Sequence, residues 1–135
     1  MGVERGGNAR AEGCAEPQVR MSNTFVTPGD AAPDEMLSEL GDGLYLVGSR
    51  GGEVSPAEGI FHFNAEYGYL IKGGELSEMV RDVSIAGSTR DTMKTIEMVG
   101  SDLRLSAGMC GKGGQSVPVS DGSPHLLLSA LVGGS

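Results

Sequence analysis

Tryptophan is absent from the sequence, and its 135 residues include only three phenylalanines and three tyrosines. The hydrophobic core must therefore rest on valine, isoleucine, leucine and methionine. Long apolar runs are missing as well, since no stretch approaches the roughly twenty residues of a membrane span and residues 1–10 lack the apolar region of a signal peptide. We therefore expect a cytoplasmic protein that neither crosses nor binds a membrane.

Basic residues are also few, with ten lysines and arginines against eighteen acidic residues and a formal net charge of −8. This charge repels phosphate groups, so we expect no direct contact with nucleic acid or with anionic membranes. Cysteine occurs only as Cys14 and Cys110. A disulfide between them is not expected, because a reducing compartment and the lack of a cysteine framework both argue against it.

Glycine, by contrast, is abundant, and its 23 residues suit short strands joined by many turns. The length fits one domain. Residues 1–18 show no periodicity and are interpreted as a polar N-terminal segment, either disordered or docked on something else. Residues 19–135 then form the domain, and it begins with alternating apolar and polar residues from Val19 to Val26 that predict a half-buried strand.

Two helices are predicted from their start and stop signals. The first covers residues 33–40, because Pro33 suits the first helical position and Gly41 can supply the C-terminal cap. Its buried stripe would comprise Met36, Leu37 and Leu40. The second covers residues 89–99, because the run from Ser88 to Asp91 has capping-box spacing and apolar residues recur at helical intervals up to Val99.

The remaining elements are expected to be strands separated by glycine-rich or proline-containing turns. Residues 72–75 resemble a hairpin turn that leads into one long strand over 76–85. The fold class predicted is therefore mainly β (α+β), an antiparallel or barrel-like assembly with two short helices. The other strand candidates are Leu44–Val47, Gly59–Asn64 and Gly68–Ile71, which suggest a meander, and the segments around Leu103–Leu105, Val117–Val119 and Leu126–Val132.

Cys110 is the residue with the clearest chemical potential. It stands in the run Gly108-Met109-Cys110-Gly111-Lys112-Gly113-Gly114, which we interpret as a flexible glycine-rich turn before a strand. A thiolate there can be a nucleophile or a soft metal ligand, because glycines let another group approach closely. The alternative is a small, half-buried residue in a surface turn. The residues alone leave both interpretations open.

Other catalytic patterns are not found. His62 and His125 are far apart in sequence and neither begins a helical zinc motif, so we interpret His62 as an exposed strand residue and His125 as structural. Ser116, His125 and Asp121 supply the residue types of a hydrolytic triad, but no Gly-x-Ser-x-Gly elbow accompanies them. The glycine-rich segments also lack phosphate-binding spacing.

A set of motifs in a fixed order does resemble a known family. From about residue 7 to the end, the chain is similar to the C-terminal domain of the TldD/PmbA family of metallopeptidases, and Cys110 places it on the TldD-like side. Val19 departs from the proline that the family usually has before Arg-Met. The motifs are Arg20-Met21-Ser22-Asn23-Thr24-Phe25, Gly43-Leu44-Tyr45, Gly68-Tyr69-Leu70-Ile71, Met98-Val99-Gly100-Ser101-Asp102-Leu103, Cys110-Gly111-Lys112 through Gly114-Gln115-Ser116-Val117-Pro118-Val119, and Val132-Gly133-Gly134.

The resemblance implies a zinc peptidase in which Cys110 is the third protein ligand. The other two ligands and a general-base glutamate belong to an upstream His-Glu-x-x-x-His motif that this chain lacks, and the open fourth position takes a water whose pKa zinc lowers. Cys14 matches no ligand position. The resemblance also implies that residues 1–18 are the remnant of a junction with an upstream domain. The chain alone is therefore expected to be inactive.

Three function classes follow from the resemblance. The first is the C-terminal part of a zinc metallopeptidase acting on short or unfolded peptides, and the second is a non-catalytic PmbA/TldE-like binding or assembly subunit. The third is a regulator of DNA gyrase through protein contact. The partners implied are a peptide substrate and either the upstream TldD half or a TldD/PmbA-type subunit in a homo- or heterodimer.

Overall fold

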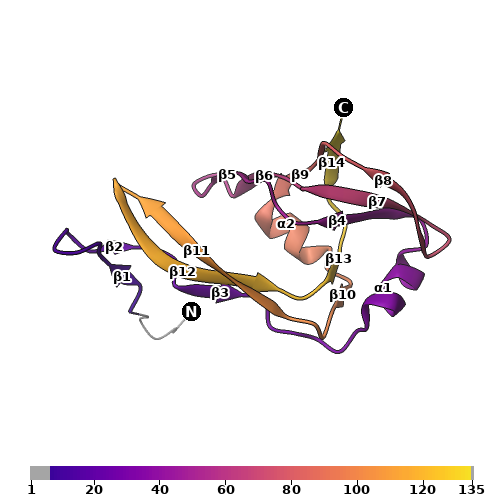
Figure 1. Ribbon diagram of the computed structural model, residues 1–135, viewed down its shortest axis with the longest axis horizontal. Helices are drawn as coiled ribbons and strands as arrows, with labels where there is room; N and C mark the ends of the chain where they lie inside the picture. Colours follow the sequence, from indigo (N-terminus) through magenta and orange to yellow (C-terminus); the bar gives the residue numbers. More distant parts are fainter. Residues whose placement is uncertain (1–6, 135) are drawn as a thin grey trace. The chain divides into compact units, whose positions relative to one another are not determined.

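Strands make up most of the computed structural model, which describes residues 7–134 and contains two short helices, as predicted (Figure 1). The described chain divides into two compact units. Unit 1 comprises residues 7–28 and 102–124, and unit 2 comprises residues 29–101 and 125–134. Residues 1–6 of the predicted polar segment lie outside the described residues.

Unit 1 is built on a long two-stranded hairpin, drawn in orange in Figure 1. Its strands β11 and β12 pair antiparallel over nine residues each, and β3 extends the sheet by running parallel to β12. A separate antiparallel pair joins β1 to β2. The strand bounds are β1 Ala9–Arg10, β2 Gln18–Val19, β3 Asn23–Phe25, β11 Arg104–Lys112 and β12 Gln115–Ser123.

The prediction of one continuous strand from Val19 to Val26 is wrong. The segment pairs with β1 up to Val19 and with β12 from Asn23, and it changes partner between them. Its apolar side chains face outward, with Val19 67% and Phe25 51% exposed, whereas Arg20 is only 6% exposed. The apolar side that the alternation predicts to be buried is therefore exposed, and in the described residues the buried side of the segment carries the arginine.

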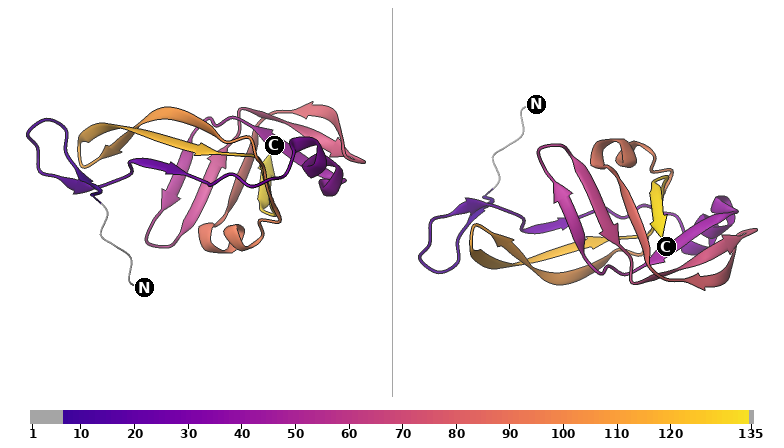
Figure 2. Two further views of the ribbon diagram at one scale, coloured as in Figure 1. Left: turned by 90° about the horizontal axis from the view of Figure 1, so that it is seen from below. Right: turned by 90° about the horizontal axis from the view of Figure 1, so that it is seen from above.

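Unit 2 contains two larger antiparallel sheets and one short strand pair (Figure 2). One sheet has the order β4-β7-β8 and the other β14-β9-β6-β5, while β10 pairs with β13. Its core includes the fully buried Ile71 with Met36, Ala65 and Val83. The bounds are β4 Gly43–Val47, β5 Gly52–Ser55, β6 Ile60–Asn64, β7 Tyr67–Lys72, β8 Glu75–Val80, β9 Val83–Ser88, β10 Met98–Val99, β13 Leu126–Leu127 and β14 Leu131–Gly134.

Helix α1 (Pro33–Leu40) has the predicted bounds. The Ala32 backbone N–H donates to the Glu35 carboxylate at 3.1 Å, which satisfies one free donor at the helix start. At the other end Gly41 adopts a φ of 64° and its N–H donates to the Leu37 carbonyl at 3.2 Å. Met36 is buried, while the other two residues of the predicted stripe are half-buried.

Helix α2 (Thr89–Lys94) begins where predicted but ends five residues earlier than predicted. The Asp91 backbone N–H donates to the Ser88 hydroxyl at 3.4 Å, as the capping-box spacing indicates. The extension to Val99 is wrong because Met98 and Val99 instead pair with β13. Neither helix in residues 7–134 has the length and apolar character needed to cross a membrane.

The long strand predicted over 76–85 is two strands in different sheets. Asp82 has a φ of 56°, a left-handed conformation that interrupts a strand. After it, β9 pairs with β6 and β14 rather than continuing along β7. The simple meander is also wrong, because the unpredicted strand β5 forms a hairpin with β6 and leaves β4 to pair with β7.

Candidate functional site

Cys110 lies within strand β11, not in the turn that the glycine run predicts. It stands opposite Val117 of β12, and its side chain is half-buried. The turn begins three residues further on, where Gly113 and Gly114 have φ values of 56° and 75°. Two successive positive φ values suit a two-residue hairpin, whereas Gly108 and Gly111 adopt strand conformations because β12 pairs with them.

Arg20 holds the backbone at Cys110 and two residues after it. One guanidinium nitrogen, Nη1, donates to the Cys110 carbonyl at 3.1 Å, and Nη2 donates to the Lys112 carbonyl at 2.9 Å. Lys112 adds a hydrogen bond in the opposite direction, from its Nζ to the Val19 carbonyl at 2.7 Å. Segments ninety residues apart in sequence are thus joined at the cysteine.

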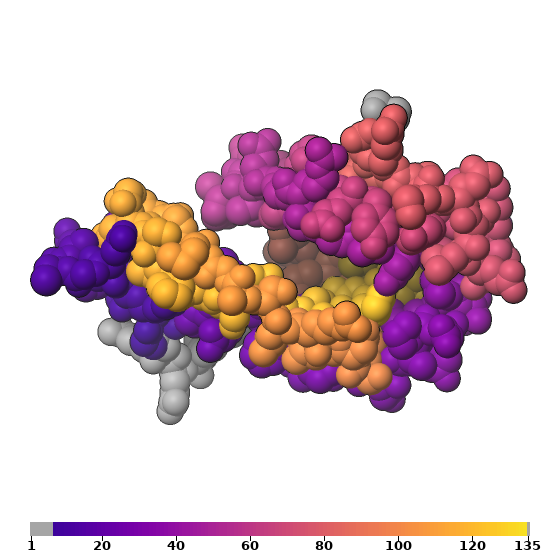
Figure 3. All heavy atoms as spheres, viewed as in Figure 1, coloured from indigo at the N-terminus to yellow at the C-terminus, as the bar shows by residue number. Residues whose placement is uncertain are grey.

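Further bonds attach the N-terminal segment to strand β12. The Ser116 backbone N–H donates to the Glu12 carboxylate at 2.7 Å, and the Glu12 N–H donates to the Gln115 side chain at 3.0 Å. Arg10 donates to the carbonyls of Met21 and Pro118. In the space-filling view this indigo segment lies directly against the orange hairpin (Figure 3). The described part of the segment is therefore docked rather than free.

Sequence reasoning missed Arg20 as a site residue. The alternation from Val19 to Val26 predicts only a polar strand position for Arg20, although the residue belongs to the motif that begins Arg20-Met21-Ser22. An arginine flanked by apolar residues gives no signal that it is buried, because its partners are backbone carbonyls that no sequence pattern reveals.

The other sequence candidates are distributed over both units. Cys14 is exposed in the loop between β1 and β2. Ser116 and Asp121 are five residues apart on β12, so they point to opposite faces of the sheet and do not form a triad. His125 is half-buried, and its Nε2 lies 2.7 Å from the Tyr45 hydroxyl while the two rings stack with centroids 5.5 Å apart.

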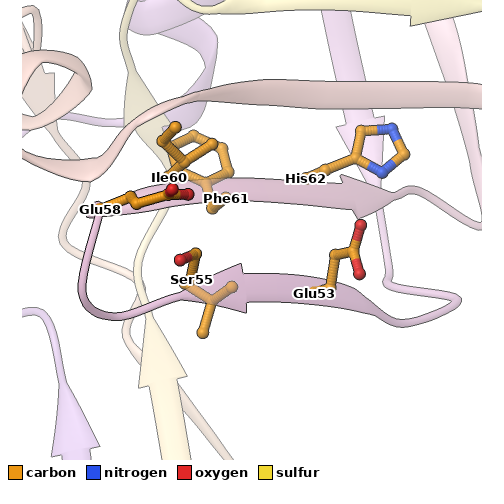
Figure 4. Close-up of a pocket in the computed structure, with 7 residues that line it drawn as sticks. Glu53, Ser55, Glu58, Ile60, Phe61 and His62 are labelled. Atoms are coloured by element: carbon orange, nitrogen blue, oxygen red, sulfur yellow. The ribbon is translucent and has the colours of Figure 1, made fainter.

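His62 lies on β6 directly opposite Glu53 of β5 and is exposed, as predicted. The two residues help to line a shallow cavity of about 290 Å³ on this hairpin (Figure 4). Glu58 and Ser55 lie at its other end. The cavity therefore combines an imidazole with carboxylates, but its side chains do not gather as metal ligands.

The described part of the chain does not by itself form a metal site. Among residues 7–134 no three side chains of histidine, cysteine, aspartate or glutamate come close enough together to hold a metal ion. Cys110 nevertheless suits one ligand position, since its thiol is a soft donor on an ordered strand and is partly accessible. A site with three protein ligands that includes Cys110 would therefore need at least one ligand from outside these residues.

Comparison with known proteins identifies the group to which this arrangement belongs. Residues 1–134 match the family described as the PmbA/TldA metallopeptidase C-terminal domain. The chain belongs to the TldD/PmbA metallopeptidase family. It is 57% identical over 129 residues, 96% of the chain, to a metalloprotease of Archaeoglobus fulgidus. It is also 42% identical over 95% of its length to the zinc metalloprotease TldD homolog of Saccharolobus solfataricus.

Solved structures share the fold of this TldD/PmbA-family domain. TldE from Thermococcus kodakarensis superimposes with a TM-score of 0.76 at 18% identity and covers 98% of the chain. A Thermotoga maritima protein described as a putative modulator of a DNA gyrase gives 0.71 at 27% identity, also over 98% of the chain. The chain spans about 30% of the length of the two curated relatives and 28% and 27% of these two solved chains.

Proposed function

We propose that this chain is the C-terminal part of a TldD-like zinc metallopeptidase that acts on short or unfolded peptides in the cytoplasm. Within it, Cys110 supplies one zinc ligand and the surrounding strands supply substrate-binding surface. The chain is inactive alone, because the other ligands and the general base come from an upstream region joined through residues 1–18 or supplied as a second chain. Zinc in such a site activates water for attack on a peptide carbonyl.

The observation that carries this proposal is the setting of Cys110. Its thiol is partly accessible, and its own backbone carbonyl accepts a hydrogen bond from the buried Arg20. Within residues 7–134 no three potential metal ligands lie close together. A single ligand on an ordered strand suits a site completed by another segment. The metalloprotease names of the Archaeoglobus and Saccharolobus relatives support the same assignment.

The second candidate is a non-catalytic binding or assembly subunit of the TldE type. The fold match to TldE favours it, since the TM-score reaches 0.76. Cys110 favours the peptidase, because the family resemblance associates this cysteine with the TldD-like branch and not with the PmbA/TldE-like branch. Under either proposal the chain associates with a TldD/PmbA-type subunit as a homo- or heterodimer. A net charge of −8 argues that any effect on DNA gyrase runs through protein contact.

The proposal is tested by adding the missing region. The chain is fused to, or mixed with, the upstream part of the Archaeoglobus relative, and bound zinc and cleavage of short peptides are measured. The 135-residue chain alone should bind zinc weakly and cleave nothing, since one thiolate cannot form a stable site. The completed protein should bind zinc tightly and cleave peptides.

Two cysteine variants make this test specific. Cys110→Ala should lower zinc occupancy and turnover of the completed protein by about tenfold or more, the scale on which a metal-ligand contact acts. Cys14→Ala should change neither, because Cys14 is exposed in the β1–β2 loop. Full zinc occupancy and turnover in the Cys110→Ala protein would refute the ligand assignment.

A further inference from the structure

Arg20 is the buried charged side chain of unit 1. Only 6% of the residue is exposed, and both terminal nitrogens of its guanidinium group donate to carbonyls of strand β11. Carbonyls two residues apart on a strand point the same way, so the planar fork of an arginine can reach those of Cys110 and Lys112 together. A lysine ammonium is a point donor and does not match this geometry.

The arrangement is costly, which indicates that it has a specific use. Burying a charge is unfavourable unless it is paired, and the acceptors that Arg20 contacts are neutral carbonyls. The third guanidinium nitrogen, Nε, is buried and has no hydrogen-bond partner among the described residues. A leucine or methionine would fill the same space without this penalty. Only the two hydrogen bonds to β11 distinguish the arginine from such an apolar residue.

Strand β11 needs such support at Cys110. It is the edge strand of its sheet, so β12 holds it from one side only. Four glycines, at positions 108, 111, 113 and 114, surround the cysteine and restrict the backbone little. Lys112 adds a second tie in the opposite direction through its bond to the Val19 carbonyl. These bonds fix the backbone at Cys110, where the glycines supply no side chains to pack.

We propose that Arg20 is a positioning residue for Cys110, whose two hydrogen bonds to the carbonyls of Cys110 and Lys112 fix the direction in which the thiol points. Its use in metal binding rests on the function proposed above, whereas the positioning itself does not. The role requires the bidentate geometry of the guanidinium and not merely its charge. Arg20→Lys therefore separates the two, since it keeps the charge and loses the fork.

Thiol reactivity measures this positioning in the 135-residue chain without any metal. In a Cys14→Ser background, the only thiol is Cys110, and its rate of reaction with 5,5′-dithiobis(2-nitrobenzoate) reports how readily strand β11 moves. We expect Arg20→Lys to raise this rate about tenfold, because two hydrogen bonds to a charged group no longer oppose local opening. An unchanged rate in the folded variant overturns the proposal.

Arg10 offers a matched control. It also donates from both terminal nitrogens to two carbonyls in unit 1, those of Met21 and Pro118, and both of these acceptors lie outside β11. Arg10→Lys should leave the Cys110 rate within about twofold of the parent chain. An equal acceleration in both variants would mean that the unit had loosened generally, and it would overturn the specific role of Arg20.

A measurement on the unsubstituted chain covers the case in which Arg20→Lys does not fold. Bonded Nη hydrogens of Arg20 should give separate, slowly exchanging nuclear magnetic resonance signals, and a single averaged signal overturns the proposal. In the completed, cobalt-substituted protein, Arg20→Lys should weaken the thiolate-to-cobalt charge-transfer band. If Cys110→Ser left this protein's metal affinity unchanged, the zinc proposal would fail while the reactivity test of Arg20 stood unaffected.

Discussion

At the scale of single residues, Asp91 shows how a local contact changes a proton affinity. The Lys94 ammonium donates to its carboxylate at 2.7 Å, and this hydrogen bond lowers the pKa of Asp91, assisted by a hydrogen bond between the Ser88 and Asp91 side chains and by the positive charge of Lys94. Because the pKa is lower in the folded chain than in the unfolded one, the stabilisation is present at neutral pH. It is lost as the pH falls through the folded-state pKa.

Removing the ammonium should reverse this shift. We expect Lys94→Met to raise the pKa of Asp91 towards its ordinary value, as measured by nuclear magnetic resonance titration of the side-chain carboxyl. Lys72→Met serves as the control, since Lys72 pairs with Glu78 and not with Asp91. An Asp91 titration that is the same in the Lys94→Met chain and the parent would contradict the assigned cause.

The residue scale also shows what the sequence reveals of the candidate site. Cys110 could be selected because thiol chemistry depends on residue type. Its strand conformation could not, because glycines permit both turn and strand and the choice depends on pairing with β12, which involves long-range contacts. Arg20 could not be selected for the same reason, since its partners are carbonyls ninety residues away.

Among the elements, local signals decided which predictions succeeded. Helix α1 was predicted with its correct bounds because Pro33 and Gly41 act within the segment itself. Helix α2 ended early because pairing of Met98 and Val99 with β13 overrides a helical spacing that those residues also satisfy. The break at Asp82 was missed because an aspartate at positive φ gives no clear sequence signal.

The β11–β12 hairpin allows a paired test of its glycines. Gly114 has a φ of 75°, so Gly114→Ala should destabilise the chain by about 1–2 kcal/mol even though an added methyl group meets no atom within 4 Å. Gly111 has strand geometry and equal space, so Gly111→Ala should be neutral or stabilising by about 0.5 kcal/mol. Urea denaturation measures both. Equal losses in the two variants would contradict the turn assignment.

In the described part of the molecule, more apolar side chains are exposed than are buried. Within residues 7–134, six apolar side chains are buried while thirteen large ones are exposed. Three of the exposed ones, Phe25, Leu105 and Met109, lie on one face of the β11-β12-β3 sheet by strand register. Such a face is typical of a surface that another protein segment covers, and the chain spans only about 30% of the length of the curated relatives.

We therefore expect the isolated chain to self-associate through this face. Sedimentation velocity at several concentrations should show a rising average mass, and Met109→Ser should weaken the association several-fold because it removes apolar surface from the contact. Met93→Ser is a matched control, since both methionines are 62% exposed and Met93 lies on helix α2. A strictly monomeric parent chain, or equal effects of the two substitutions, would contradict this expectation.

The division of unit 1 into two stretches, residues 7–28 and 102–124, has a consequence for the order of folding. Strand β3 cannot pair with β12 until the ribosome has synthesised residues 29–101 of unit 2, whose hairpins are local in sequence and close quickly. Strand β3 must therefore remain unpaired with β12 while the middle of the chain folds. Cys110 consequently reaches its fixed setting late, and until then the nascent thiol depends on the reducing capacity of its surroundings.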